Sequence, residues 1–572
     1  MALAVCLAPV GIARAETASE GAERVPALRK LPWERDTAMT PPAEPAHAAD
    51  RKADEDREPA ATSPAVSAAT PASDTVPEAA SKTDTASEEP AQQEPEIVDG
   101  PPVPAHPTVA IIRNKLDDPK ITKDAADEDV AALQAFYRSW GEPPLWITKT
   151  ELSEKGQTVL TEIGKSEEWG LDPDAFTVPE ADVVPATDEA QALAEITLDL
   201  AILKYARRAR GDRHVPSEVS DLFDQSLTLH DPKIVMAGIA SSESPDNYLQ
   251  SLHPSHEQFE RLRKALIEAR SADEPNETDI RRLVINMERW RWMPEELGPF
   301  YVWLNTPSFM LYVVKDGETV FEDKTLVGTI GNPTPVFSAG MKTVVFNPDW
   351  IAPPTVLKEK FWPALKRKSF NILKSNKISV SYRGKRIDPA KIDWRRTNIH
   401  KFTFRQKAGP KNVLGKAKFL YPNKHIVYMH DTLPPRRKIF KKDVRAIGYG
   451  CVRMAKPQAF AAVMLAEDQD LPRSEVKQLW DKSVNKSVTM EREPPVHTTY
   501  FTAVVDKEGK VSTFKDLYGL DRKHATALFD SAEGFPKPPP EKKTRSRSVA
   551  SSAPSQDTGG GGGFTNSLGF GD

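Results

Sequence analysis

Two residues in the C-terminal half of the chain have types and surroundings that suit nucleophilic catalysis. His430 ends an apolar stretch, and Cys451 follows the glycine-flanked turn Gly448-Tyr449-Gly450, ahead of a helix expected to begin at Pro457. A cysteine is a strong nucleophile only as its thiolate, which requires a histidine or a positive environment nearby. Glycines also let backbone N–H groups converge on one point, where they stabilise the oxyanion of a tetrahedral intermediate. This pattern is typical of acyl transfer through a cysteine.

A lone cysteine also has a plain structural interpretation, since free cysteine is often a small buried apolar residue. The chain holds two cysteines, Cys6 and Cys451, so neither a disulfide framework nor a cysteine-rich zinc site is expected. If Cys6 is removed with a leader segment, Cys451 is the one thiol left. An exported protein that keeps an unpaired thiol usually has a use for it, which favours the catalytic interpretation.

Residues 1–15 predict export as a signal peptide. An apolar run ends in Ala13-Arg14-Ala15, a small-x-small cleavage site. The usual basic start is missing, so the apolar terminus of a cytosolic protein is the alternative; the valine before Cys6 disfavours a lipoprotein site. No later segment has about 18 consecutive apolar residues. We therefore expect a periplasmic protein, anchored to the membrane only if the leader stays uncleaved.

Both ends of the chain are predicted to be disordered. Residues 16–107 hold 15 prolines and 19 acidic against eight basic side chains, the composition of an acidic linker. Residues 526–572, with three consecutive prolines and five consecutive glycines, predict a second disordered tail.

The part between the tails predicts an α+β multidomain fold. Over residues 108–298 apolar residues recur at steps of three and four, as in Val130, Leu133 and Tyr137, which predicts a mostly helical scaffold domain. Over residues 299–525 the period becomes two, which predicts a β-rich domain with a mixed, sandwich-like sheet. A hairpin turn is expected at Asp316-Gly317. Further strands are expected at 342–346, 425–429 and 500–505.

The wider sequence around the two reactive residues resembles a known family. The runs that carry the likeness are Thr334-Pro335-Val336-Phe337, Asn347-Pro348-Asp349-Trp350, Arg405-Gln406, Gly409-Pro410, Asn412, Leu414-Gly415, Tyr428-Met429-His430-Asp431-Thr432 and Gly450-Cys451-Val452-Arg453. They are similar to the L,D-transpeptidases with a YkuD-type catalytic domain. Runs in the helical part are similar to the scaffold domain of the long Gram-negative class, among them Pro144-Leu145-Trp146 and Gly170-Leu171-Asp172-Pro173. The resemblance covers about residues 108–525.

The resemblance implies a peptidoglycan L,D-transpeptidase that forms 3→3 cross-links between stem peptides. Cys451 would attack the amide between residues three and four of a tetrapeptide, with His430 as the general base. A carbonyl or the side chain at Asp431 would orient His430. The backbone N–H groups of Tyr449, Gly450 and Cys451 would form the oxyanion hole. No metal or organic cofactor is implied.

Three further residues are candidate substrate contacts. Arg453 either binds a substrate carboxylate or supports the catalytic turn, and Asn412 and Arg405 belong to the run that leads into the histidine. The sequence departs from the family before the cysteine, where Gly448 and Tyr449 replace the usual Ser or Thr and the frequent His or Ser. That departure keeps D-amino-acid exchange and L,D-carboxypeptidase hydrolysis open as dominant activities.

A strong positive charge surrounds the expected site. Residues 358–445 hold 26 Lys and Arg against five acidic residues. A basic cleft would attract and hold the carboxylates of stem peptides. Nucleic-acid binding is the usual interpretation of such a run, but no recognised motif accompanies it, and a solvated basic surface is the third interpretation. Residues 351–400 break the strand pattern and predict a basic insertion, which the family resemblance implies is a lid.

The family also implies partners. These are a donor tetrapeptide, an acceptor amine, carbapenem-type β-lactams as inhibitors and outer-membrane proteins if they accept the acyl group. A non-catalytic wall-binding structural protein with a decayed turn is the alternative from another class.

Overall fold

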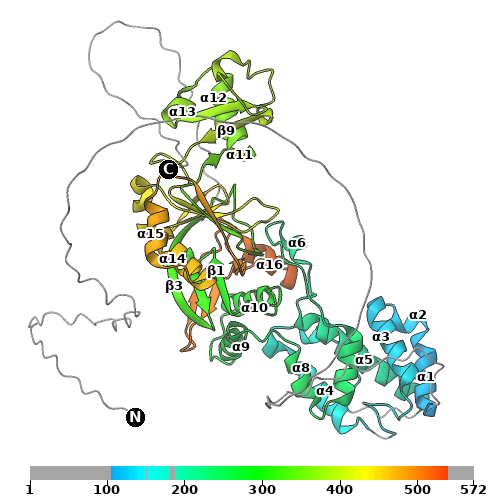
Figure 1. Ribbon diagram of the computed structural model, residues 1–572. Helices are drawn as coiled ribbons and strands as arrows, with labels where there is room; N and C mark the ends of the chain where they lie inside the picture. The colour runs from blue at the N-terminus through cyan, green and yellow to red at the C-terminus, as the bar shows by residue number, and fades with distance from the viewer. Residues whose placement is uncertain (1–104, 150, 181–186, 539–572) are drawn as a thin grey trace, which may run out of the picture. The chain divides into compact units, whose positions relative to one another are not determined.

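The computed structural model describes residues 105–149, 151–180 and 187–538 (Figure 1). The predicted signal peptide 1–15, nearly all of the linker 16–107 and most of the tail 526–572 lie outside the described residues. None of the helices in the described ranges is both long enough and apolar enough to cross a membrane.

The N-terminal region is helical, as predicted for residues 108–298. Its helices are α1 (Pro107–Leu116), α2 (Pro119–Thr122), α3 (Asp127–Ser139), α4 (Glu154–Gly164), α5 (Asp188–Ala209), α6 (Pro216–Val219), α7 (Pro232–Ser241), α8 (Pro245–Ser251), α9 (Glu257–Arg270) and α10 (Glu277–Arg291). Helix α5 begins after Thr187, whose hydroxyl accepts the N–H of Ala190 and so caps the first turn. The predicted apolar stripes face one core, where Leu133 and Tyr137 of α3 meet α5.

Two buried carboxylates on α5 explain the run Pro144-Leu145-Trp146. Glu195 accepts the backbone N–H groups of Leu145 and Trp146, and Asp199 accepts the indole N–H of Trp146 at 2.7 Å. Burial raises the pKa of Asp199 to about 7. This run therefore anchors the loop after α3 to the centre of the helical domain.

The β-rich domain is built around a large mixed sheet, and with the helical region this confirms the α+β expectation. Its strands are β1 (Phe300–Asn305), β2 (Met310–Lys315), β3 (Glu318–Gly328), β4 (Phe337–Gly340), β5 (Thr343–Phe346), β10 (Ala417–Leu420), β11 (Met429–His430), β12 (Ala446–Gly448), β13 (Val452–Met454), β14 (Lys486–Thr489) and β15 (Pro495–Thr499). The order is β14-β5-β10-β11-β13-β3-β2-β1-β15-β4, with β12 beside β3. Helices α14 (Pro457–Gln469) and α15 (Arg473–Asp481) contribute apolar side chains to the core of this sheet.

The expected hairpin joins β2 to β3. Asp316 and Gly317 have φ of 50° and 78°, so both central residues of the two-residue turn are left-handed. This geometry matches the twist of the flanking strands. The prediction from the Asp-Gly pair is confirmed.

Two strand predictions are wrong in their extent. Within residues 425–429 only Met429 belongs to a strand, because the side chain of Asn423 bonds backbone groups of residues 421, 425 and 427 and folds this segment into a turn. Within residues 500–505 the strand is β16 (Ala503–Val505), paired with β17 (Val511–Thr513). The N–H groups of residues 501 and 502 donate to the side chains of Asn305 and Asn286 in place of a neighbouring strand.

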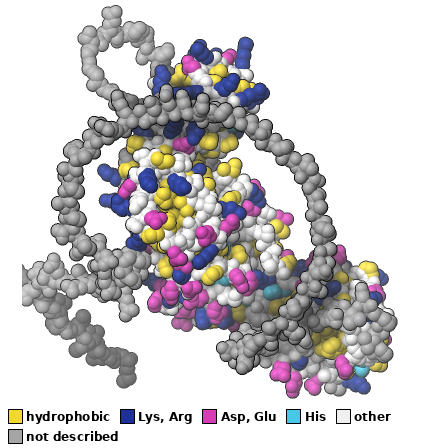
Figure 2. All heavy atoms as spheres, viewed as in Figure 1, with side chains coloured by type: hydrophobic (Ala, Val, Ile, Leu, Met, Phe, Trp, Pro, Cys, Tyr) yellow, Lys and Arg dark blue, Asp and Glu magenta, His cyan; other side chains and the backbone are white. Residues whose placement is uncertain are grey.

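The basic insertion is a small folded unit. It consists of β6 (Trp350–Ile351), α11 (Pro354–Val356), a π turn (Leu357–Phe361), α12 (Trp362–Lys366), α13 (Asn371–Ser375), β7 (Ile378–Tyr382), β8 (Lys385–Ile387) and β9 (Phe402–Gln406). Its sheet has the order β6-β9-β7-β8 and closes at Gln406, slightly beyond the predicted 351–400. It has its own apolar core, and Lys and Arg side chains gather on its surface (Figure 2).

The β-rich domain continues past residue 525. Helix α16 (Leu520–Phe529) packs against α10, and Arg289 donates to the buried carboxylate of Asp521 at 2.7 Å. Phe535 joins the same contact and is buried. The chain is therefore folded for several residues beyond the predicted boundary.

Candidate active site

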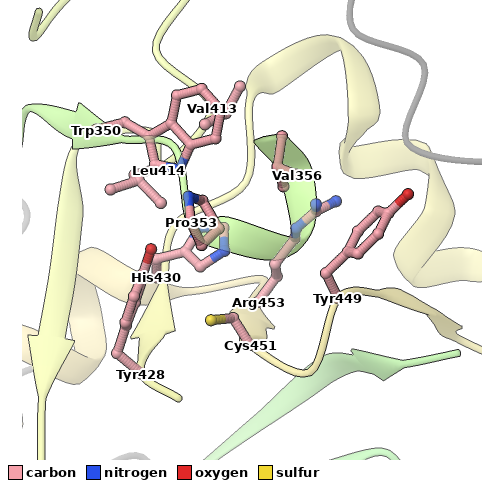
Figure 3. Close-up of a pocket in the computed structure, with 10 residues that line it drawn as sticks. All are labelled: Trp350, Pro353, Val356, Val413, Leu414, Tyr428, His430, Tyr449, Cys451 and Arg453. Atoms are coloured by element: carbon pink, nitrogen blue, oxygen red, sulfur yellow. The ribbon is translucent and has the colours of Figure 1, made fainter. Parts of the chain in front are cut away.

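Strand pairing brings His430 and the segment after Cys451 together. Strand β11 lies between β10 and β13, and His430 is the parallel partner of Arg453. The N–H of Val452 donates to the carbonyl of Tyr428 at 3.2 Å. Because Cys451 immediately precedes β13, its side chain and that of His430 line the same pocket (Figure 3).

A threonine hydroxyl shapes the turn that precedes Cys451. Gly450 has φ of 85°, a left-handed conformation that favours glycine. Its carbonyl accepts the hydroxyl of Thr334 at 2.8 Å, and the same hydroxyl accepts the N–H of Gly328 at 2.9 Å. Thr334 belongs to one of the runs that carry the family resemblance, but its sequence context alone assigned it no role.

Gly448 has a steric reason for departing from the family pattern. A Cβ at this position would lie 3.0 Å from the carbonyl oxygens of Cys451 and Val327. A serine or threonine would therefore require the turn or strand β3 to shift. In this chain the glycine belongs to the local backbone arrangement.

His430 is buried and neutral. Its side chain is 4% exposed, and Nδ1 lies 2.7 Å from the carbonyl oxygen of Asp431. A carbonyl can only accept, so Nδ1 carries the proton and Nε2 keeps its lone pair. Burial, followed by the charge of Arg453, lowers the pKa of His430 to about 3. The imidazole can therefore act as a base.

Asp431 orients His430 through its carbonyl, one of the two expected possibilities. Its carboxylate accepts the N–H groups of Lys416 at 2.9 Å and Thr432 at 2.6 Å, and the guanidinium of Arg437 at 3.0 Å. Burial raises the pKa of this carboxyl group. The side chain thus organises the loop around the histidine.

The thiol of Cys451 is partly exposed and lies 4.0 Å from the carbonyl oxygen of Ile426. Burial of the sulfur raises the pKa of the thiol above its ordinary value, while Tyr428 and Arg453 lower it. With the thiol and the imidazole both neutral, attack by the sulfur would require transfer of its proton to a base.

The pocket is narrow, with a volume of about 50 Å³. Its lining residues are Trp350, Pro353, Val356, Val413, Leu414, Tyr428, His430, Tyr449, Cys451 and Arg453 (Figure 3). The first three belong to the insertion. Tyr449 also approaches the insertion, since Nζ of Lys360 lies 5.9 Å from the centre of its ring.

Arg453 and the turn that carries the expected oxyanion donors lie beside Cys451. Within the described residues, no backbone hydrogen bond uses the N–H groups of Gly450 or Cys451. Arg453 is 8% exposed, its side chain is directed into the pocket (Figure 3), and burial lowers its pKa to about 10. It remains a cation at neutral pH and faces the space beside the thiol.

The other two candidate substrate contacts lie elsewhere. Asn412 is buried, its amide donates to the carbonyls of residues 348 and 407 at 2.9 and 3.1 Å, and its oxygen accepts the N–H of Leu414. This amide holds its own loop and does not line the pocket. Arg405 pairs with Asp349 at 2.8 Å and lines a neighbouring groove of about 1020 Å³, which meets the pocket at Tyr428.

Parts of the chain are similar to known protein families and to a curated protein. Residues 299–480 match a family model described as the L,D-transpeptidase catalytic domain, YkuD, and residues 131–266 match one described as a scaffold domain. A Haemophilus influenzae protein named "Putative L,D-transpeptidase" is 32% identical over 242 residues, which cover 42% of this chain and 48% of that protein. This chain therefore spans about half the length of that relative.

Two solved structures are also similar over part of the chain. The carbamoyl enzyme of Ldtfm with avibactam is 11% identical and covers 36% of this chain and 51% of its own, with a TM-score of 0.17. An L,D-transpeptidase from Mycobacterium smegmatis is 10% identical and covers 35% of this chain and 58% of its own, with a TM-score of 0.17.

The two family matches show which domains the chain contains. Residues 299–480 match the YkuD L,D-transpeptidase catalytic domain, and residues 131–266 match a scaffold domain. The resemblance expected from the sequence runs is confirmed.

Proposed function

We propose that this protein is a periplasmic peptidoglycan L,D-transpeptidase that forms 3→3 cross-links through a Cys451 acyl-enzyme. The observation that supports this function best is the shared pocket of Cys451, His430 and Arg453 within a YkuD domain. The pocket combines a nucleophile, a neutral base and a fixed cation, which are the groups that acyl transfer from a carboxylate-bearing peptide needs.

The first half of the reaction forms the acyl-enzyme. Nε2 of His430 takes the thiol proton as the sulfur of Cys451 attacks the carbonyl of the third stem residue. The N–H groups of Gly450 and Cys451 stabilise the resulting oxyanion. The C–N bond to the fourth residue then breaks, the leaving amine takes the proton from His430, and a thioester remains.

The second half transfers the acyl group. The side-chain amine of the third residue of another stem peptide attacks the thioester carbonyl and passes a proton to Nε2 of His430. The C–S bond breaks, the sulfur of Cys451 recovers the proton, and an amide joins the two stems. His430 acts as a base and then as an acid in each half, so no group other than this pair has to store the proton.

Arg453 and the basic insertion are assigned to substrate binding. The guanidinium of Arg453 faces the pocket and pairs with a stem-peptide carboxylate. Trp350, Pro353 and Val356 of the insertion line the same pocket, so the insertion covers the acyl site as a lid. The surrounding positive charge attracts the anionic stems.

The acceptor decides which product forms. Water gives a tripeptide, a free D-amino acid gives exchange, and an amine of an outer-membrane protein gives an anchored protein. Carbapenem-type β-lactams acylate Cys451 in the same way when the sulfur opens the lactam ring. A non-catalytic wall-binding protein would form none of these products.

Mass spectrometry tests the proposal directly. Purified protein is incubated with tetrapeptide muropeptides, and Cys451→Ala serves as the matched control. We expect an acyl adduct on the wild type, a tetrapeptide–tripeptide dimer and released D-amino acid, with none of them from Cys451→Ala. Tripeptide without dimer would indicate a carboxypeptidase. The absence of both adduct and product would refute the enzyme assignment.

A further inference from the structure

A residue of the scaffold region contacts the loop that leads to the catalytic histidine. Asp224 lies between α6 and α7, within the residues that match the scaffold domain. Its carboxylate lies 2.8 Å from Nε2 of His425 and forms an ion pair with Nζ of Lys424. These two partners are neighbours on the loop of residues 422–427.

The backbone around Asp224 is fixed by pairing with the catalytic domain. The N–H of Asp224 donates to the carbonyl of Val336 at 2.9 Å, and the N–H of Val336 donates to the carbonyl of Leu222 at 2.7 Å. Phe223 is buried with its ring 5.2 Å from that of Trp292. This short bridge holds the carboxylate at a defined place beside the loop.

The opposite side of the same loop contacts the nucleophile. The carbonyl oxygen of Ile426 lies 4.0 Å from Sγ of Cys451, close enough to accept a weak hydrogen bond from the thiol. Ile426 has φ of 58°, a left-handed conformation that is strained for a β-branched residue, and its side chain is 68% exposed. A strained and exposed turn keeps its shape only when its neighbours hold it in place.

Two groups within the catalytic domain also support the turn. Asn423 donates to the carbonyl of Val427 at 2.8 Å, and its oxygen accepts the N–H of His425 at 3.1 Å. The ring of Phe337 lies 5.6 Å from that of His425. The scaffold region adds a third support, which is the contact of Asp224 with Lys424 and His425.

We propose that Asp224 is a positioning residue for the nucleophile: by holding Lys424 and His425, it keeps the carbonyl of Ile426 against the thiol of Cys451. The scaffold domain thereby completes the active site and does more than tether it. This inference builds on the proposed function, because it assigns Asp224 an effect on acylation of the same cysteine.

Acylation kinetics test the positioning role. We compare Asp224→Ala, Asp224→Asn and Asp224→Glu with Asp221→Ala. The last variant removes an exposed carboxylate from the same segment between α6 and α7. The maximal rate constant for acylation by a carbapenem is expected to fall about tenfold in Asp224→Ala, with half-saturation changed by less than about twofold. Asp224→Glu should recover part of the loss, and Asp221→Ala should match the wild type.

Alkylation of the thiol adds a measurement that does not require a wall substrate. A hydrogen bond donated by the thiol stabilises its protonated form, so losing the Ile426 carbonyl should lower the pKa of Cys451 in Asp224→Ala. The alkylation rate with iodoacetamide is followed against pH, and the midpoint is expected to shift down by about half a unit. General destabilisation would not slow acylation while making the thiol easier to ionise.

A double-variant cycle identifies the contact through which Asp224 acts. His425→Ala should slow acylation, and adding Asp224→Ala to it should have little further effect. Acylation of Asp224→Ala within about twofold of the wild type would overturn the inference. So would an equal loss in Asp221→Ala, or an unchanged alkylation midpoint. If the wild type itself is not acylated, the proposed function fails, and the alkylation midpoint still decides whether Asp224 positions the thiol.

Discussion

The neutral state of His430 makes a prediction about how stability depends on pH. The imidazole is 4% exposed, and burial and the charge of Arg453 lower its pKa from the ordinary 6.5 to about 3. The unfolded chain therefore takes up a proton on this histidine before the folded chain does. Stability from the neutral, buried histidine is present above pH 6.5 and is lost progressively as the pH falls toward 3.

The size of this loss follows from the shift. Each pH unit between the two pKa values changes the free energy of unfolding by about 1.4 kcal/mol. Lowering the pH from 7 to 5 should therefore remove about 2 kcal/mol of stability through His430 alone. Other buried groups titrate over the same range, so the contribution has to be isolated as a difference between two proteins.

Urea unfolding of the wild type and His430→Gln at pH 7 and pH 5 provides that difference. Glutamine is uncharged and has no group that gains a proton over this pH interval. The wild type should lose about 2 kcal/mol more than the variant over this pH interval. His400→Gln, at an exposed histidine, should behave as the wild type does.

Equal losses in the wild type and His430→Gln would refute the reasoning. They would mean that His430 titrates in the folded protein as it does in the unfolded chain. The imidazole would then be partly charged near pH 6, and its assignment as a neutral base that accepts the Cys451 proton would fail.

Three further substitutions test the parts that support the site. Thr334→Val removes the hydroxyl that bridges strand β3 and the carbonyl of Gly450; it should cost about 1–3 kcal/mol in urea unfolding and slow carbapenem acylation. Gly448→Ser restores a family residue, but its Cβ would meet two carbonyl oxygens at 3.0 Å. We expect slower acylation and a lower melting temperature, whereas Gly164→Ser, with open space around it, should leave acylation unchanged. Arg289→Ala leaves a buried carboxylate of α16 without its partner and should cost about 3–5 kcal/mol of stability, measured by urea unfolding. Full stability in that variant would contradict the importance of the α10–α16 contact.

The features that sequence predicted well depend on local physical rules. The hairpin at Asp316-Gly317 follows from the left-handed conformation that this pair adopts readily. The helical stripe of Leu283, Met287 and Trp290 in α10 follows from the helical period, and these side chains are buried as expected. Neither feature needs information from a distant part of the chain.

The features that sequence missed depend on contacts between distant residues. Asn412 occurs in a motif that leads into His430, yet its amide donates to the carbonyl of Pro348. The N–H groups of this amide donate to backbone carbonyls and so do not bind a substrate. Only the fold shows this. Similarly, Asp224 and His425 are 201 residues apart, and no local period or turn rule relates them.

The choice between the two possible orienting groups on Asp431 shows why the motif alone was insufficient. A His-Asp pair commonly indicates a carboxylate that bonds the imidazole, and the residue type cannot exclude that geometry. In the folded chain, backbone N–H groups and Arg437 occupy the carboxylate, so the carbonyl accepts the Nδ1 proton. A neutral carbonyl stabilises an imidazolium less than a carboxylate would, which agrees with the low pKa of His430. In the proposed mechanism, a weakly basic His430 would return the proton from Cys451 readily to the leaving amine.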